Sequence, residues 1–190
     1  MEIYPDRIPL EIQALQSFLL WKNISKEDGK MTKSPISRAG FGIAHNNTDE
    51  LMPFEYAKER LSKASDLGLG VSLLDGIKVN VETHTGYLWC LDFDGFAEPN
   101  SDKVDDGVKE FIDAFPSYIE ISPSGTGFKY FFVCDRPPQS KSKIKFGPSD
   151  FADEYPNVSK YAHREIEVFS RSFYLALTGQ VFSPSTAEIK

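Results

Sequence analysis

One short stretch, LWCLDFDGF at residues 88–96, constrains the fold of this chain more than any other. Its bulky apolar residues predict a buried β-strand, in which successive side chains face opposite sides of the sheet. Leu91 and Phe93 therefore share one face, while Asp92 and Asp94 share the other. The apolar face is expected to meet helices, so the opposite face must accommodate two neighbouring carboxylates.

The segments that follow predict a β-α-β-β-α-β order. We expect a helix at 101–115, capped by Ser101 or Asp102, and weak helical character at 145–161. The buried face of the first helix is expected to comprise Val104, Val108, Phe111, Ile112 and Phe115. Strands are expected at 87–96, 117–122, 128–133 and 164–170, with a further strand within 173–182. The order is the split βαβ arrangement of ferredoxin-like and RNA-recognition-motif-like folds.

The first part of the chain predicts a smaller α/β module. The patterns predict strands at 17–24 and 67–74, an amphipathic helix within 49–64, a basic loop at 29–42 and a polar connector at 75–86. The basic loop contains Lys30, Lys33 and Arg38. The expected fold class is therefore α+β: one domain over 1–190, with an N-terminal α/β module (about 1–85) packed on an RNA-recognition-motif-like module (about 86–190).

Charge and hydropathy narrow the functional classes. The net charge of −7 argues against a surface that coats DNA generally, so any nucleic-acid contact must be local. The sequence shows neither an apolar run of membrane-spanning length nor a secretion signal, and we expect a cytoplasmic protein with no membrane contact. Cys90 and Cys134 have no partner Cys or His at metal spacing and are expected to be packed thiols.

The expected topology gathers acidic side chains from several strands. In a split βαβ sheet the first strand lies between the third and the fourth, and aligning the apolar faces places six charged residues on the other surface: Asp92, Asp94, Glu120, Lys129, Glu165 and Glu167. Clustered carboxylates repel one another unless a cation neutralises them, and an oxygen-only set suits Mg²⁺ or Mn²⁺. The alternative is a solvated pair of acids at a strand end.

A glycine-containing turn lies beside this cluster. The segment SPSGTG at 122–127 predicts a tight hairpin, and the backbone amides of Gly125 and Gly127 together with Ser124 could cradle phosphates. Lys129 would then point at a phosphate, or else be a strand lysine that snorkels to solvent or a counter-ion to the acids. Three further lysines, Lys141, Lys143 and Lys145, are expected in a solvated loop rather than in a nucleic-acid stripe.

Three segments in sequence order, LDFDGF, EISPSGTGFKYFF and EIEVFSRSFYLALTG, resemble the signature motifs of the archaeo-eukaryotic primase superfamily. The closest resemblance is to the primase-polymerase domains of phages, plasmids and other mobile elements. The upstream segments LLWKNISKEDGKMTKSPIS and LGLGVSLL are similar to those that precede the motifs in that group, so the resemblance covers about 18–179.

The resemblance implies roles for individual residues. It makes Asp92, Asp94 and Glu167 the catalytic metal ligands, and Thr178 and Gly179 structural. It also implies a nucleotide-binding set of Ser124, Gly125, Thr126, Gly127, Lys129 and Arg171. Two departures stand out. Lys129 occupies the position of a histidine in most relatives, and Phe173 stands where relatives often carry arginine, a role that Arg171 could take.

The implied function is template-directed nucleotidyl transfer from ribonucleoside or deoxyribonucleoside triphosphates during replication of a mobile element. Two ions, Mg²⁺ or Mn²⁺, would activate a 3′-hydroxyl and stabilise the departing pyrophosphate. The implied partners are a single-stranded DNA template or primer–template, guided by Lys30, Lys33 and Arg38, and a helicase in the same or a neighbouring chain.

Two alternatives stay open at this stage. CLDFDGF also resembles the aspartyl nucleophile motif of haloacid-dehalogenase phosphatases, with Asp92 as nucleophile and Asp94 as acid/base. A catalytically inactive primase-like module would instead bind nucleotides or single strands, with Phe131 and Phe169 stacking on bases.

Overall fold

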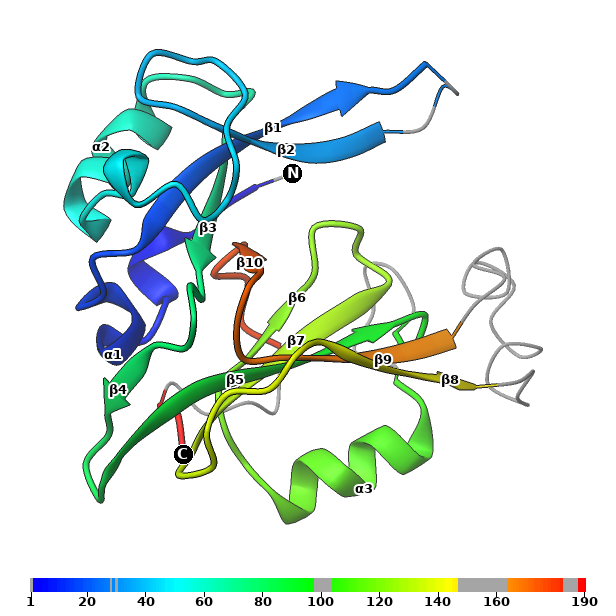
Figure 1. The fold of residues 1–190 in the computed structure, drawn as a ribbon. Helices are drawn as coiled ribbons and strands as arrows, with labels where there is room; N and C mark the ends of the chain where they lie inside the picture. The colour runs from blue at the N-terminus through cyan, green and yellow to red at the C-terminus, as the bar shows by residue number, and fades with distance from the viewer. Residues whose placement is uncertain (1, 28, 30, 98–103, 147–163, 183–187) are drawn as a thin grey trace.

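The computed structural model describes residues 2–27, 29, 31–97, 104–146, 164–182 and 188–190. Within these residues the chain has an α+β fold that is mostly β, with ten strands in two antiparallel sheets and three α-helices (Figure 1). None of the helices in the described ranges is long and apolar enough to cross a membrane.

The first sheet has the strand order β10-β3-β1-β2. Its strands are β1 (Phe18–Ser25), β2 (Met31–Ile36), β3 (Gly68–Ser72) and β10 (Tyr174–Leu177). Helices α1 (Leu10–Gln13) and α2 (Phe54–Ser62) and two short 3₁₀ turns, Pro5–Arg7 and Thr48–Glu50, accompany it. In α2, the buried side chains Phe54 and Ala57 pack against β1 and β3, as expected for an amphipathic helix.

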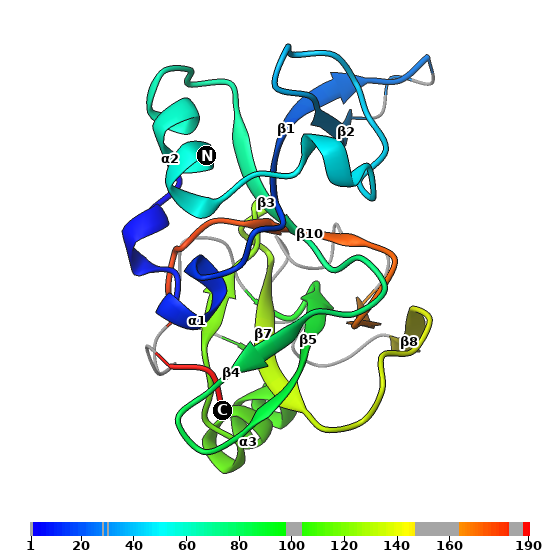
Figure 2. The ribbon, with the colours of Figure 1, turned by 60° about the vertical axis from the view of Figure 1, so that its left-hand side comes forward.

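The second sheet has the order β6-β7-β5-β9-β8, and β4 pairs with the start of β5. These strands are β4 (Lys78–Asn80), β5 (Thr85–Asp94), β6 (Ile119–Ile121), β7 (Gly127–Cys134), β8 (Ser142–Phe146) and β9 (Arg164–Phe169). Helix α3 (Asp106–Ala114) lies on the face of this sheet that points away from the first sheet (Figures 1 and 2). The predicted place of β5, between β7 and β9, is confirmed.

Apolar packing joins the two sheets into one body. The largest cluster of buried side chains includes Phe18 and Leu69 from the first sheet and Leu88 and Phe131 from the second. A second cluster fills the space between α3 and the second sheet, where Phe93 stacks on Phe128 with ring centroids 4.6 Å apart. The apolar side of β5 therefore meets the helix, as the alternation in its sequence predicts.

Three strands lie where the sequence predicted loops, connectors or solvated lysines. β2 falls in the expected basic loop at 29–42, β4 in the connector at 75–86, and β8 in the lysine-rich segment. β2 and β8 are the terminal strands of the described sheets. Edge strands tolerate proline and charged side chains because only one side of the backbone must pair. Pro35 in β2 and the lysines of β8 therefore do not prevent strand formation.

Helix α3 is shorter than predicted. Its N-cap is Asp105, whose side chain accepts a hydrogen bond from the Gly107 amide at 3.1 Å, rather than Ser101 or Asp102. Val104 precedes the helix and forms a β-bridge with Ala97, while Phe115 lies beyond its end and is 61% exposed. The buried face predicted for this helix is therefore confirmed for Val108 and Ile112 and wrong for Phe115. The helical character expected at 145–161 falls mostly outside the described residues.

Two strands cross the expected boundary near residue 85. β10 belongs to the first sheet, where Leu175 pairs with Val71 of β3, although it follows the second sheet in the sequence. β4 precedes the boundary but pairs with β5, with Val79 opposite Gly86. The further strand predicted within 173–182 is thus present, and it links the two sheets.

Candidate functional site

Five neighbouring strands of the second sheet each contribute one charged side chain at the same level. The pairing runs from Glu120 to Lys129, from Lys129 to Asp92, from Asp92 to Glu167 and from Glu167 to Lys143. Directly paired residues present their side chains on the same face, so these five form one row, which we call the charged rung. Asp94 and Glu165 pair with each other one step along the same face. The strand pairing confirms that the six charged residues predicted to share one face of the sheet do so: Asp92, Asp94, Glu120, Lys129, Glu165 and Glu167.

Three carboxylates of this surface could hold a divalent cation. Asp92, Asp94 and Glu167 each offer an oxygen, and these oxygens lie within 4.8 Å of one another. Asp92 Oδ1 is buried and has no hydrogen-bond partner among the described residues. A buried acceptor without a partner is costly, and a cation would satisfy it. The oxygen-only donor set also fits Mg²⁺ or Mn²⁺.

Lys129 is the cation that contacts Asp92 in this structure. Its Nζ donates a hydrogen bond to Asp92 Oδ2 at 2.6 Å, and both side chains are largely buried. Burial opposes the charge on Lys129, but the Asp92 carboxylate outweighs it and raises the pKa of the ammonium above its ordinary value. Lys129 therefore makes the contacts expected of a counter-ion to the acids.

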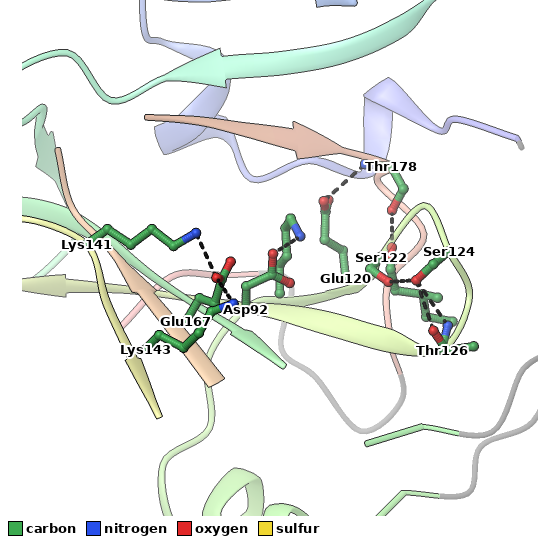
Figure 3. Close-up of polar contacts among 11 residues, drawn as sticks. Asp92, Glu120, Ser122, Ser124, Thr126, Lys141, Lys143, Glu167 and Thr178 are labelled. Atoms are coloured by element: carbon green, nitrogen blue, oxygen red, sulfur yellow. Dashed lines mark hydrogen bonds and ion pairs between the residues drawn. The ribbon is translucent and has the colours of Figure 1, made fainter. Parts of the chain in front are cut away.

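Two more lysines converge on Glu167 from the edge of the sheet. The Glu167 Oε1 atom lies 2.7 Å from Lys141 Nζ and 2.9 Å from Lys143 Nζ (Figure 3). Lys143 also lies 2.5 Å from Glu165, and the Lys141 ammonium is 4.8 Å from the ring centroid of Phe169. The prediction of a solvated loop is wrong for Lys143, which lies in β8, whereas Lys141 directly precedes this strand and both residues are exposed. The pairing of β8 with β9 nevertheless brings both ammonium groups to Glu167.

The carboxylates differ in their electrostatic surroundings. Burial, followed by the charge of Asp92, raises the pKa of Asp94 to about 6. Burial also acts to raise the pKa of Glu167, but hydrogen bonds from Lys141 and Lys143 bring it below its ordinary value. The Asp94 carboxylate is therefore poorly compensated, unlike that of Glu167, and a cation beside it would be stabilising.

A cleft of about 630 Å³ opens between the two sheets directly above these acids. Asp92, Glu167 and Lys129 lie on one side. The first sheet contributes Trp21 and Asn23 of β1, Met31, Thr32 and Lys33 of β2, and Tyr174, Leu175 and Ala176 of β10. The apolar ends of the sheets share a core while their polar ends enclose the cleft.

Among the described residues of the expected basic loop, Lys33 is the cation that lines this cleft. Its ammonium lies 5.7 Å from the ring centroid of Trp21, and burial, followed by the nearby charge of Lys129, lowers its pKa. The Tyr174 hydroxyl donates a hydrogen bond to the Lys33 carbonyl at 2.6 Å and so joins β10 to β2. The strand pairing therefore holds Lys33 over the acids.

The other predicted basic residues lie elsewhere. Arg38 donates a hydrogen bond from Nη2 to the Leu51 carbonyl at 2.7 Å, and Arg171 pairs with Asp75 at 3.1 Å. Neither arginine is among the described residues that line the cleft. Lys30 falls outside the described residues. The structure therefore brings together the acids and Lys33, but not the arginines.

The turn between β6 and β7 has the predicted hairpin form. Gly125 adopts a φ of +77°, and the hydroxyls of Ser122, Ser124 and Thr126 form a chain with spacings of 2.8 and 3.1 Å (Figure 3). The Gly125 amide, which we expected to be available for a phosphate, instead donates a hydrogen bond to the Ser122 carbonyl at 2.9 Å, so that expectation is wrong. Ser124 lines the cleft, whereas Thr126 is buried.

Glu120 occupies the buried end of the charged rung. It is 0% exposed and accepts hydrogen bonds from the Thr178 and Gly179 amides, both at 3.0 Å, and from the Tyr118 hydroxyl at 2.9 Å. The prediction that Glu120 faces an open surface is wrong, because the chain that leaves β10 covers it. Burial raises the pKa of Glu120 to about 7, against the opposing effect of these hydrogen bonds.

Sequence reasoning missed Trp21, Asn23 and Tyr174, which belong to the other sheet. The proximity of the two sheets is a tertiary property, which the alternation pattern within one strand does not indicate. The side chains of Phe131 and Phe169, which are expected to stack on bases in a binding module, are 0% and 1% exposed. In this structure neither ring is open to a base.

No protein-family model matches this chain, and no curated protein shows significant similarity to it.

Proposed function

We propose that this chain is a primase-polymerase catalytic domain of the archaeo-eukaryotic type, which adds nucleotides to a nucleic-acid strand. The observation that carries the proposal is the meeting of Asp92, Asp94 and Glu167, from two strands, beside a cleft large enough for a nucleotide. The order of β5, α3, β6, β7 and β9, with β5 in the centre of the sheet, supports an RNA-recognition-motif-like module.

The proposed metal ligands are Asp92, Asp94 and Glu167, with Asp92 Oδ1 as the buried oxygen that lacks another partner. A divalent ion bound there would supply Lewis-acid stabilisation of charge on the reacting phosphoryl group and its neighbouring oxygens. Its charge would also compensate Asp94, whose raised pKa reports a poorly neutralised carboxylate.

The chain's own cations bind and orient the substrate in this proposal. Lys129 lies next to Asp92 on the side of the sheet that leads to Ser124. A cation on Asp92 would displace the Lys129 ammonium from Oδ2, and a triphosphate is the anion that would then pair with it. Lysine serves here as a point charge and supplies no proton near neutral pH. Lys33, on the opposite wall of the cleft, would add a second positive charge.

A binding module without catalysis is the second candidate function, and one specific observation favours it. Lys129, Lys141 and Lys143 already neutralise Asp92 and Glu167, so the site is electrostatically satisfied to a large extent without metal. A phosphatase has less support, because the Lys129 ammonium is bound to Asp92 Oδ2 and would oppose the attack of this carboxylate on phosphorus.

Primer extension with labelled nucleotides and Mn²⁺ or Mg²⁺ tests the proposal. We expect extension by the wild type and a loss of about 100-fold or more in Asp92→Asn and Glu167→Gln. Asp113→Asn is the matched control, because it removes a carboxylate whose partner, Lys109, lies on α3 away from the cleft. Undiminished extension by Asp92→Asn and Glu167→Gln would reject this site. Binding of nucleotide or oligonucleotide without extension under either metal would establish the second candidate.

A further inference from the structure

Lys141 and Lys143 stand at one end of the carboxylate group, opposite the end that leads to Ser124. Across the sheet the order is Ser124 and Lys129 at β6 and β7, then Asp92 on β5, Glu167 on β9 and Lys143 on β8. Adjacent strands lie about 4.8 Å apart, so Lys129 and Lys143 start from backbone positions roughly 14 Å from each other. Asp92 and Glu167 therefore lie between Lys129 on one side and Lys143 on the other.

The lysines at the β8 end are held in place but remain accessible. Both ammonium groups contact the same Glu167 oxygen, and the Lys141 ammonium also lies 4.8 and 5.2 Å from the ring centroids of Phe169 and Phe173. The side chains of Lys141 and Lys143 are 39% and 36% exposed, whereas that of Lys129 is 7% exposed. A large ligand arriving from solvent can reach Lys141 and Lys143.

The charge balance of this surface depends on what the acids bind. Asp92, Asp94, Glu165 and Glu167 carry four negative charges when ionised, and Lys129, Lys141 and Lys143 form ion pairs with three of them, Asp92, Glu165 and Glu167. Lys145 also stands opposite Glu165 in the pairing of β8 with β9. Divalent cations on the acids would leave the lysines without counter-ions. An anion near Lys141 and Lys143 would then be stabilised by both ammonium groups, which act as point charges toward phosphate.

The in-line geometry of phosphoryl transfer decides which anion fits. The attacking and leaving oxygens lie on opposite sides of the reacting phosphorus, so the triphosphate and the attacking strand approach from opposite sides. If the triphosphate occupies the end with Ser124 and Lys129, the strand that carries the attacking 3′-hydroxyl occupies the β8 end. Within the described part of the sheet β8 is the last strand.

We propose that Lys141 and Lys143 form a binding site for backbone phosphates of the strand that accepts the nucleotide. This inference rests on the proposed function, and it assigns the β8 end of the charged rung to nucleic acid rather than to the triphosphate. Glu167 is paired with both ammonium groups when no metal is bound, so a metal ion that takes up Glu167 frees them, and strand binding and metal binding favour each other.

The test measures binding of a fluorescent single-stranded oligonucleotide at several salt concentrations, with Mn²⁺ and without nucleotide. The double variant Lys141→Gln/Lys143→Gln is expected to bind more weakly than the wild type. Its plot of log K against log salt should be less steep by about 1.4, because each phosphate contact on a single strand contributes about 0.7. Wild-type affinity should rise when Mn²⁺ is added, while triphosphate binding by the double variant should stay unchanged.

Two controls separate a local phosphate contact from loss of charge or fold. The variant Lys63→Gln/Lys109→Gln removes the same charge from two exposed ion pairs, one at the end of α2 and one in α3. It should keep the wild-type slope of log K against log salt. Lys141→Arg/Lys143→Arg keeps both charges and should restore the slope. Circular dichroism establishes that each variant folds. An oligonucleotide with neutral methylphosphonate linkages near its 3′ end should bind wild type more weakly, with no further loss in the double glutamine variant.

The outcomes distinguish the inference from the function on which it rests. If wild type binds Mn²⁺ and extends primers, but the double glutamine variant keeps the wild-type salt slope, the inference fails alone. A loss of triphosphate affinity with unchanged oligonucleotide affinity would also overturn it, by assigning the lysines to the nucleotide. If wild type shows neither metal binding nor extension, the proposed function and the inference fail together.

Discussion

At the scale of single residues, the site is a set of buried charges whose partners lie on neighbouring strands. Asp92 and Lys129 are a largely buried pair, and neither charge can be removed without leaving the other in a poorly hydrated environment. Glu120 is fully buried beside Lys129, but it is compensated by two backbone amides and a tyrosine hydroxyl. Each group therefore has a measurable effect on stability that is independent of activity.

The first residue-scale prediction is a double-mutant cycle on the Asp92–Lys129 pair. Asp92→Asn and Lys129→Met should each lower the free energy of unfolding by about 3 kcal/mol, because each leaves a buried charge unpaired. The double variant should lose much less than the sum of the two changes. Chemical denaturation in a metal-free buffer measures all four proteins. Additive losses would show that the two groups do not interact in solution.

The second residue-scale prediction concerns pH and Glu120. Because burial raises the folded-state pKa from 4.5 to about 7, the folded protein binds more protons than the unfolded chain between these values. Stability from this group is therefore fully present below about pH 4.5 and lost as pH rises to about 7, with a total on the order of 3 kcal/mol. Asp94, with its pKa raised to about 6, contributes in the same direction.

Glu120→Gln removes the titration and keeps one oxygen acceptor, whereas Glu120 accepts from the Thr178 and Gly179 amides through its two separate oxygens. The variant should therefore show a flatter dependence of unfolding free energy on pH between 5 and 8 than the wild type. Thermal melts across this range are the measurement, with Glu188→Gln, an exposed residue paired with Lys190, as the matched control. An unchanged slope in Glu120→Gln would mean that Glu120 titrates normally in the folded protein.

At the scale of elements, the hairpin between β6 and β7 shows two different uses of glycine. Gly125 is at the turn, with a positive φ and open space where a side chain would project. Gly127 is at the start of β7, where an added Cβ would collide with the carbonyl oxygen of Phe93 on β5. The second glycine thus permits the close approach that aligns Lys129 with Asp92.

This difference predicts opposite tolerance at the two positions. Gly127→Ala should destabilise the protein by about 2–4 kcal/mol, because the backbone of β5 cannot move away without breaking its ladder. Gly125→Asn should cost less than about 1 kcal/mol, because asparagine tolerates the left-handed region and meets no neighbour. Denaturant titration of both variants checks the prediction. Equal losses at the two positions would contradict it.

The sequence predicts the elements of the second sheet better than their environment. Period-two alternation was enough to place Asp92 beside Lys129 and Glu167, because the register of a half-buried strand follows from its apolar face. It could not reveal the edge strands β2, β4 and β8, whose residues are largely polar. It also could not show that Glu120 is covered, since that depends on a later part of the chain returning over β6.

At the scale of the whole molecule, two sheets share one core, and the cleft exists only where they face each other. The link is made by side chains from both sheets, including Leu69 and Phe131, and by β10, which returns to the first sheet after β9. The acids and the opposing wall with Lys33 and Tyr174 are therefore assembled only when both sheets are folded.

This arrangement predicts cooperative unfolding of the entire described chain. The two tryptophans report on the two sheets, since Trp21 lies in β1 and Trp89 in β5. Trp21→Phe and Trp89→Phe variants isolate each signal, and each variant's fluorescence transition in urea should coincide with its own circular-dichroism transition. Separate transitions within either variant would show that the sheets unfold independently.

The return of β10 to the first sheet also bears on how such a gene can change. No single cut within the chain separates one complete sheet from the other. The reason is that β10, which follows β9, pairs with β3, a strand encoded about a hundred codons earlier. Recombination is therefore expected to transmit the span from β1 to β10 as one unit of inheritance.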